Sequence, residues 1–135
     1  MTCFILKERK GMTVKYIKSG LWIEKLEDSY RLGLSEKGQD DVGEVMYVEL
    51  PEFGDRLEKG EILLSVEGAK AVTEIVTPIT GVIESLHKEL EDNTELLNST
   101  DRSDNWIVEL SNVEGFDSDE LSEDPWFGEE KLEEN

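Results

Sequence analysis

The chain is 135 residues long, which is enough for one domain with a modest hydrophobic core. Its 33 acidic residues outnumber 14 basic ones and give a formal net charge of −19, which argues against a nucleic acid partner because a phosphate backbone would repel this surface. Cys3 is the single cysteine and His87 the single histidine, so an intrachain disulfide, a thiolate metal cluster and a histidine-rich zinc site are excluded, and no metal site is expected.

Residues 1–12 are charged and show no periodic pattern, and we expect them to form a flexible leader. Their charges follow a very short apolar run, which is the reverse of the order in a secretory signal. No apolar run in the chain approaches the ~20 residues that a membrane-spanning helix needs. We therefore expect a cytoplasmic protein without a membrane partner.

The middle of the chain consists of short runs of alternating or clustered apolar residues bounded by turn residues, which is the pattern of β-strands. The predicted strands are, in chain order, residues 14–18, 21–26, 30–34, 44–50, the two arms of a hairpin over 62–76, then 82–86 and 106–110. Many short strands joined by turns predict one all-β domain over about residues 13–112, with a sandwich or barrel-like architecture.

Two segments between these strands carry a different pattern. Ser35 is expected to cap a short helical turn or loop over residues 35–43, and residues 90–100 are expected to form a loop or a single helical turn. His87 lies in a polar stretch, and we expect it to be exposed, as a surface or structural residue rather than a catalytic one.

Residues 113–135 are predicted to form an acidic tail. From residue 111 onward the chain holds ten acidic residues against one basic residue, Lys131, and this density of like charge favours a solvated segment. The alternative is a short helix that packs on the domain. Its apolar residues would be Leu121, Trp126, Phe127 and Leu132.

Lys70 stands in the middle of the predicted hairpin, between the small residues Ala69 and Ala71. Apolar and β-branched residues flank this segment on both sides, as in two pairing strands. Such a hairpin presents one amine on a rigid base with little bulk around it, which is what an enzyme needs to acylate a chosen lysine. The lysine would then make a domain without catalytic groups a carrier of a prosthetic group. Most lysines at hairpin tips only keep an exposed turn soluble, so this window alone leaves both interpretations open.

Five motifs follow one another over residues 43–110. They are Gly43–Pro51, Gly54–Glu61, Val66–Ala71 with the sequence Val-Glu-Gly-Ala-Lys-Ala, Thr77–Gly81 with a Pro-x-x-Gly turn, and Glu95–Asn98 followed by Trp106 and the last strand. Together they resemble the H protein family of the glycine cleavage system, a relative of biotinyl and lipoyl carrier domains. Each motif alone is weak, but five in order over roughly eighty residues form a strong signal.

The resemblance implies a flattened β-barrel of two sheets and a non-enzymatic carrier whose Lys70 bears a covalent, amide-linked lipoate. It also implies that Glu67, Gly68, Ala69 and Ala71 shape the site that a lipoate ligase or lipoyl transferase recognises, although small residues are equally expected in a tight turn. Dihydrolipoyl dehydrogenase or glycine decarboxylase would be visited by the loaded arm. A biotin carrier fits less well, because that class places methionines where Ala69 and Ala71 stand.

The chain also departs from the family pattern. Ser19–Ile23 stands in the region of the family's His-x-Trp-Val opening, Gly68 replaces the usual serine, and Ser99–Trp106 replaces the usual Pro-Tyr-Gly-x-Gly-Trp approach to the last strand. The acidic tail replaces a helical C-terminus. These departures favour an H-like paralogue over a true H protein that carries the aminomethyl group in glycine cleavage. Some H-like proteins undergo reversible ADP-ribosylation linked to oxidative stress, with a sirtuin-type ADP-ribosyltransferase and a macrodomain hydrolase as partners, and that role is attractive here.

Two other classes stay open. In an interaction or regulatory module, Lys70 would be unused and the acidic tail would bind the partner. An enzyme that acts through paired carboxylates is the least favoured class, because the acidic residues are spread over surface-like positions and no nucleophile constellation accompanies them. No catalytic residue is therefore expected.

Overall fold

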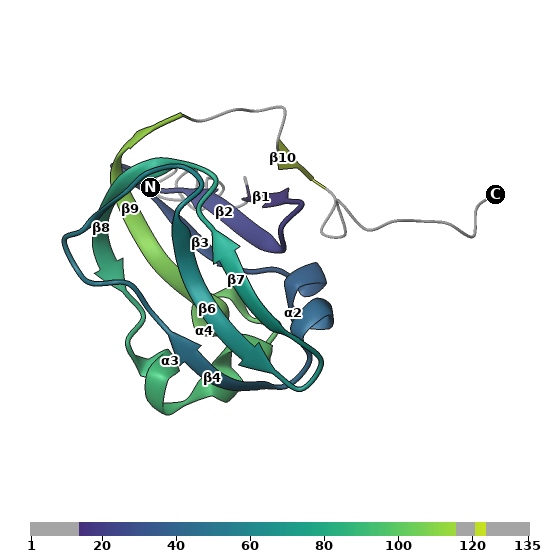
Figure 1. The fold of residues 1–135 in the computed structure, drawn as a ribbon. Coiled ribbons are helices and arrows are strands. Elements are labelled where there is room, and N and C mark those ends of the chain that lie inside the picture. Colours follow the sequence, from purple (N-terminus) through teal and green to yellow (C-terminus); the bar gives the residue numbers. More distant parts are fainter. Residues whose placement is uncertain (1–13, 116–120, 124–135) are drawn as a thin grey trace, which may run out of the picture.

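The computed structural model describes residues 14–115 and 121–123, which form two stacked antiparallel β-sheets (Figure 1). The seven-stranded sheet has the order β10-β1-β2-β3-β9-β8-β5, and the three-stranded sheet has the order β4-β6-β7. The strands are β1 (Val14–Ile17), β2 (Leu21–Lys25), β3 (Ser29–Leu34), β4 (Val45–Glu49), β5 (Arg56–Leu57), β6 (Ile62–Gly68), β7 (Val72–Val76), β8 (Thr80–Leu86), β9 (Trp106–Glu114) and β10 (Leu121–Ser122). The short helices are α2 (Glu36–Val42), α3 (Glu89–Asp92), the 3-10 helix η1 (Thr94–Asn98) and α4 (Arg102–Asn105). The prediction of an all-β sandwich of two sheets is confirmed.

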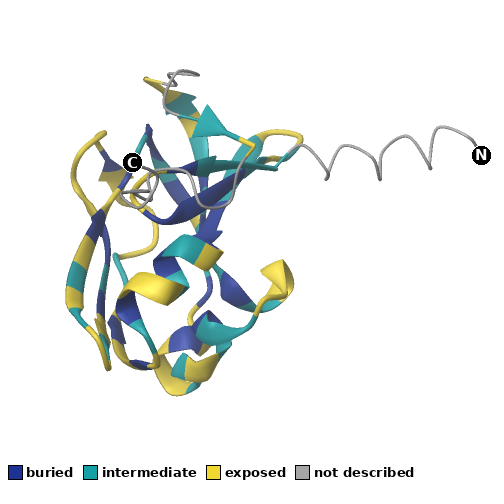
Figure 2. Cartoon of the chain, turned by 90° about the vertical axis from the view of Figure 1, so that its right-hand side faces the viewer, coloured by how far each residue is buried: buried dark blue, intermediate teal, exposed yellow. Residues whose placement is uncertain are grey.

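The hydrophobic core unites buried side chains from both sheets (Figure 2). The three-stranded sheet contributes Leu64, Val66 and Ile75, each at most 3% exposed. The seven-stranded sheet contributes, among others, Leu32 and Leu110, which are fully buried. Burial of a whole Leu, Ile or Val side chain stabilises a fold by about 1.5–3 kcal/mol. The core therefore fixes the strands on which the site described below is built.

Helix α2 forms where Ser35 is expected to cap a helical turn. The Ser35 hydroxyl accepts a hydrogen bond from the Gly38 backbone N–H, and the helix ends at Gly43. The Gln39 side-chain amide donates to the carbonyl oxygens of Leu97 and Ser99, at 2.8 and 2.6 Å. The helix is thereby tied to η1, which matters because its C-terminal end contacts the β6–β7 hairpin.

His87 is buried, with 8% of its surface accessible, so the expectation of an exposed residue was wrong. Its backbone N–H donates to the carbonyl oxygen of Ile107 in β9, which extends the β8–β9 pairing, and its ring stacks on Trp106 with the ring centroids 4.6 Å apart. The Nδ1 atom lies 2.7 Å from the Trp106 carbonyl oxygen. The charged residues that follow His87 suggested a surface position, whereas continued strand pairing turns the ring inward. His87 is a structural residue.

The segment after β8 holds more helix than expected, because α3 and η1 occupy residues where a loop or a single turn is predicted, and α4 follows them. Asp101 caps α4 by accepting a hydrogen bond from the Ser103 N–H at 3.0 Å. This bond has the largest effect on the pKa of Asp101, which it lowers. A second hydrogen bond, from the Ser103 hydroxyl, lowers the pKa further. Strand β9 then ends at Glu114 and not at residue 110 as predicted.

The C-terminal region adds a short strand to the edge of the large sheet. β10 pairs with β1 through Ile17 and Leu121, and Lys15 forms a 3.1 Å ion pair with Glu123. Leu121 therefore lies in a strand and not in a short helix. The other residues considered for a tail helix, namely Trp126, Phe127 and Leu132, and the predicted leader with Cys3 lie outside the described residues. The domain limits drawn from the sequence stay predictions.

None of the described helices has the length and apolar character to cross a membrane.

Candidate functional site

The β6–β7 hairpin places Lys70 at its tip, beside α2 (Figure 1). The two strands pair as far as Glu67 and Val72, and the Gly68 N–H donates to the Ala71 carbonyl oxygen at 2.9 Å. This bond closes a four-residue loop in which Lys70 is exposed and its neighbours carry nothing larger than a methyl group. The structure therefore contains the predicted hairpin with a single amine at its tip.

The tip does not project freely, because its backbone is hydrogen-bonded to residues 42–44, which we call the seat. The Lys70 N–H donates to the Val42 carbonyl oxygen at 2.9 Å, and the Ala69 N–H donates to the Glu44 carbonyl oxygen at 2.8 Å. Backbone donors at a loop tip otherwise face water. These two bonds hold the loop against a segment whose position is set by α2, so the rigid base of the lysine comes from the seat as well as from the two strands.

Two glycines allow the tip and the seat to approach so closely. A Cβ atom at Gly68 would collide with the Val42 carbonyl oxygen and would lie 2.8 Å from the carbonyl carbon. Gly43 has a φ of +76°, and a Cβ atom there would lie 2.9 Å from Lys70 Cγ. Gly68, which departs from the family pattern, is therefore required by packing against the seat.

Asn98 fixes the seat from the other side. Its Oδ1 accepts a hydrogen bond from the Val45 N–H at 2.8 Å, and its Nδ2 donates to the Gly43 carbonyl oxygen at 3.0 Å. One side chain of η1 thus satisfies two backbone groups next to the hairpin tip. A continuous chain of hydrogen bonds links Asn98 to the seat and the seat to Lys70.

Asn98→Ala is expected to destabilise the fold by about 1–3 kcal/mol, because it leaves two partly buried backbone groups without their partner. Urea unfolding measures this loss. Asn93→Ala is a matched control, since within the described part of the chain the Asn93 side chain makes no hydrogen bond, and it is expected to change stability by no more than about 0.5 kcal/mol. Equal losses in the two variants would contradict the role of Asn98.

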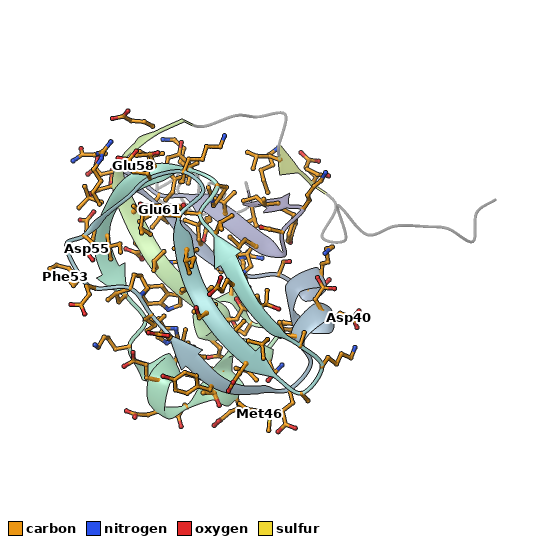
Figure 3. All side chains as sticks on the ribbon, in the orientation of Figure 1. Asp40, Met46, Phe53, Asp55, Glu58 and Glu61 are labelled. Atoms are coloured by element: carbon orange, nitrogen blue, oxygen red, sulfur yellow. The ribbon has the colours of Figure 1, made fainter. Side chains whose placement is uncertain are left out.

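The Lys70 side chain lies along the C-terminal end of α2, where Asp40 is found (Figure 3). Nζ donates to the Asp40 carbonyl oxygen at 2.9 Å and lies 3.6 Å from the Asp40 carboxylate. Helix α2 has no basic residue in its last turn, so Lys70 supplies the positive charge that a helix C-terminus favours. With the two side chains 59% and 55% exposed, this ion pair contributes at most about 1 kcal/mol. The amine is held, but weakly enough to be released.

The other residues proposed from the sequence surround Lys70 in two different environments. Glu67 and Ala69 are exposed, whereas Gly68 and Ala71 are half-buried. Sequence reasoning missed Asp40, Asn98 and the contact with the seat. Hydrogen bonds between distant backbone segments leave little trace in a sequence, and the only available signal was a pair of glycines at the two places where the segments meet.

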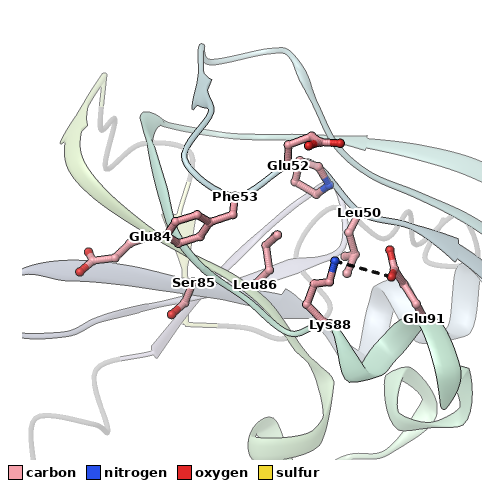
Figure 4. Close-up of a pocket in the computed structure, with 9 residues that line it drawn as sticks. Leu50, Glu52, Phe53, Glu84, Ser85, Leu86, Lys88 and Glu91 are labelled. Carbon is pink, nitrogen blue, oxygen red and sulfur yellow. Dashed lines mark ion pairs between the residues drawn. The ribbon is translucent and has the colours of Figure 1, made fainter.

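A groove of about 560 Å³ lies at the end of β4 that is farther from the hairpin tip (Figure 4). It begins at Leu50 and includes the ion pair between Lys88 and Glu91, whose charged atoms are 4.0 Å apart. The hairpin tip, by contrast, pairs with Val45 at the other end of the strand. The groove is thus separate from the lysine. Within residues 14–115 and 121–123, no group of three His, Cys, Asp or Glu side chains is arranged to hold a metal ion.

Comparison with known proteins bears on what an amine in this position does. The profile of the family described as glycine cleavage H-protein matches residues 14–133. The glycine cleavage system H protein of Listeria monocytogenes serotype 4b (strain CLIP80459) is 37% identical over 102 residues, which cover 76% of this chain and 82% of that protein. The glycine cleavage system H protein of Shewanella woodyi is 41% identical over 98 residues, which cover 72% and 76%.

A solved structure has a similar fold. The crystal structure of a glycine cleavage system H protein from Mycobacterium marinum superposes with a TM-score of 0.70 and covers 82% of this chain and 89% of its own. Because the sequence identity is 20%, this likeness concerns the fold alone. It agrees with the arrangement of two sheets described above.

Proposed function

Because this chain belongs to the glycine cleavage H-protein family, whose members carry lipoate on a lysine and are not themselves catalysts, we propose that Lys70 carries the lipoyl group. The main support for the proposal is the hairpin tip bound to the seat. The Lys70 amine is exposed there, while hydrogen bonds to Val42 and Glu44 hold the backbone of the tip in place. A carrier needs both properties, since the loading enzyme must find one amine at a defined position while the arm beyond it stays free to move.

The residues present fit a lipoyl group. Ala69 and Ala71 leave room on both sides of the amine, and the seat fixes the Lys70 backbone without covering Nζ. When bound, lipoate supplies a dithiolane that exchanges electrons and groups with partner enzymes. Conversion of the amine to an amide removes the ammonium charge, so the ion pair with the Asp40 carboxylate is lost, although the amide keeps one N–H that can donate to the Asp40 carbonyl oxygen.

We assign recognition by the lipoate ligase or lipoyl transferase to Glu67 and Ala69, because both are exposed beside the amine. Gly68 and Ala71 support recognition indirectly. Gly68 allows the loop to reach the seat, and the Ala71 carbonyl oxygen closes the loop.

Loading followed by reduction tests this function. The purified chain is incubated with a lipoate ligase, ATP and lipoate, and then with dihydrolipoyl dehydrogenase and NADH. A lipoyl carrier gains one lipoyl group and then supports NADH oxidation, whereas the unloaded chain does not. A chain that several ligases leave unmodified would favour the interaction module, in which the lysine is unused.

Two finer roles differ in their partners. A true H protein accepts the aminomethyl group from glycine decarboxylase, whereas some H-like paralogues are substrates of a sirtuin-type ADP-ribosyltransferase and a macrodomain hydrolase. Residues 99–105 favour a paralogue, because a capped helical turn stands where the family has its usual approach to the last strand. Methylamine transfer from glycine to the loaded chain would identify the first role. Transfer of ADP-ribose from NAD⁺ to the loaded chain would identify the second.

A further inference from the structure

Exposed apolar side chains are concentrated on the three-stranded sheet. Six large hydrophobic residues in the described part of the chain are exposed, and five of them belong to β4, β6 or β7. These five are Met46, Tyr47, Ile62, Val72 and Val76, with exposures from 40% to 73%. Figure 3 shows Met46 projecting outward from β4. A cluster of exposed apolar side chains on one face is typical of an interaction surface.

The register of the sheet arranges this face in rows that start at the hairpin tip. Directly opposite residues on paired strands share a face, so Tyr47, Glu67 and Val72 form the first row. Glu49, Ser65 and Glu74 form the next row, about 7 Å farther from the tip. The intervening row, which includes Val48 and Val66, points into the core. We call the two outward rows the outer face.

The charge of the outer face has one sign. Strands β4, β6 and β7 contain no lysine or arginine, and Glu49, Glu67 and Glu74 are exposed. Within the described residues none of these three glutamates forms an ion pair. By contrast, Glu109 in the seven-stranded sheet and Glu123, which follows β10, each form one. Lys70 lies at the end of the same hairpin, beyond the row that contains Glu67, and acylation would neutralise its charge.

Charge decides which occupant fits this surface. A second copy of the chain would bring unpaired glutamates against unpaired glutamates, and an anionic lipid surface would repel them as well. A protein that presents lysine or arginine side chains beside apolar ones would pair with the three glutamates and cover Tyr47 and Val72, which lie on either side of Glu67. Such an occupant would also be guided to the row that adjoins Lys70.

We propose that the outer face is the docking surface for the enzyme that acylates Lys70, with Tyr47 and Val72 as apolar contacts and the three glutamates as partners for its basic residues. The inference rests on the proposed function and extends it, because recognition then reaches a second row of residues beyond the hairpin tip. The docked enzyme lies beside the tip, and the seat sets the distance between the docking surface and the amine.

The double substitution Glu49→Lys with Glu74→Lys tests the proposal without touching the hairpin tip. The KM of a lipoate ligase for this carrier, measured with ATP and lipoate in excess, is expected to rise by about tenfold or more, with kcat within about twofold of the original, because steering and docking are lost but the amine is unchanged. Glu49→Gln with Glu74→Gln is expected to give an intermediate rise. Val72→Thr, which adds a polar atom without changing shape, is expected to raise KM severalfold.

The matched control is Glu27→Lys with Glu84→Lys, which makes the same change in net charge at two exposed positions in the β2–β3 turn and on β8. Its KM is expected to stay within about twofold of the original. An equal KM increase in the two double variants would mean that net charge and not this face matters, and would overturn the proposal. An unchanged KM in the first variant would overturn it too. If ligases never modify the original chain, the proposed function fails, and the docking surface with it.

Discussion

Lys70→Arg is expected to abolish lipoylation completely while the fold stays intact. Arginine keeps a positive charge beside Asp40, and the side chain it replaces is 59% exposed, so the free energy of unfolding should change by no more than about 0.5 kcal/mol. A guanidinium cannot take the place of the lysine amine as the acylated nucleophile, since it stays protonated at working pH. Incorporation of labelled lipoate measures the loss, and thermal unfolding measures stability.

The matched control for this variant is Lys88→Arg, an exposed lysine at the start of α3. It is expected to be labelled as fast as the original chain, because Lys88 lies beside the groove and not at the hairpin tip. Label retained by Lys70→Arg would contradict the assignment of the carrier lysine. Loss of label together with unfolding would show that the lysine has a structural role instead.

Gly68→Ser is expected to damage both the fold and the loading of the arm, even though serine is the usual residue of the family at this position. A Cβ atom at residue 68 would collide with the Val42 carbonyl oxygen, so either the seat or the hairpin tip must shift. Overpacking of this kind destabilises a fold by about 1–3 kcal/mol. The shift also weakens the bonds from Ala69 and Lys70 to the seat, so lipoylation should slow.

Ala69→Ser is the control for stability alone, because it introduces the same side chain one residue away at an exposed position. Its stability is expected to lie within about 0.5 kcal/mol of the original chain. Chemical denaturation is measured on both variants, and the initial rate of lipoylation is compared between Gly68→Ser and the original chain. Faster loading in Gly68→Ser without any loss of stability would show that Gly68 limits recognition by the ligase and that packing against the seat is unimportant.

Local patterns in the sequence were sufficient for the longer strands and for the position of the lysine, whereas β5 and β10, of two residues each, were not predicted. Runs of apolar residues marked β2 and β3, each of which buries three consecutive residues, and Ser35 marked the start of α2 because its hydroxyl satisfies a free backbone donor. The hairpin tip was recognisable because small residues interrupt two β-branched runs. The two-sheet architecture followed from the many short strands.

Features that depend on contacts between distant segments were not predictable in this way. The burial of His87 depends on Trp106, which lies 19 residues farther along the chain, and the seat depends on the approach of Val42 to Gly68. Asn98 ends one of the five motifs, but nothing in that motif indicates that its side chain supports both Gly43 and Val45. The outer face also escaped notice, because only the register of β4, β6 and β7 places its glutamates in rows.

Peptide mapping is the most direct way to determine whether Lys70 is the residue loaded with lipoate. The chain is co-expressed with a lipoate ligase in the presence of free lipoate, and its intact mass and peptide masses are then determined. We expect a gain of one lipoyl group, confined to the peptide that contains Lys70. A lipoyl group on another lysine, or an unmodified chain after trials with several ligases, would contradict it.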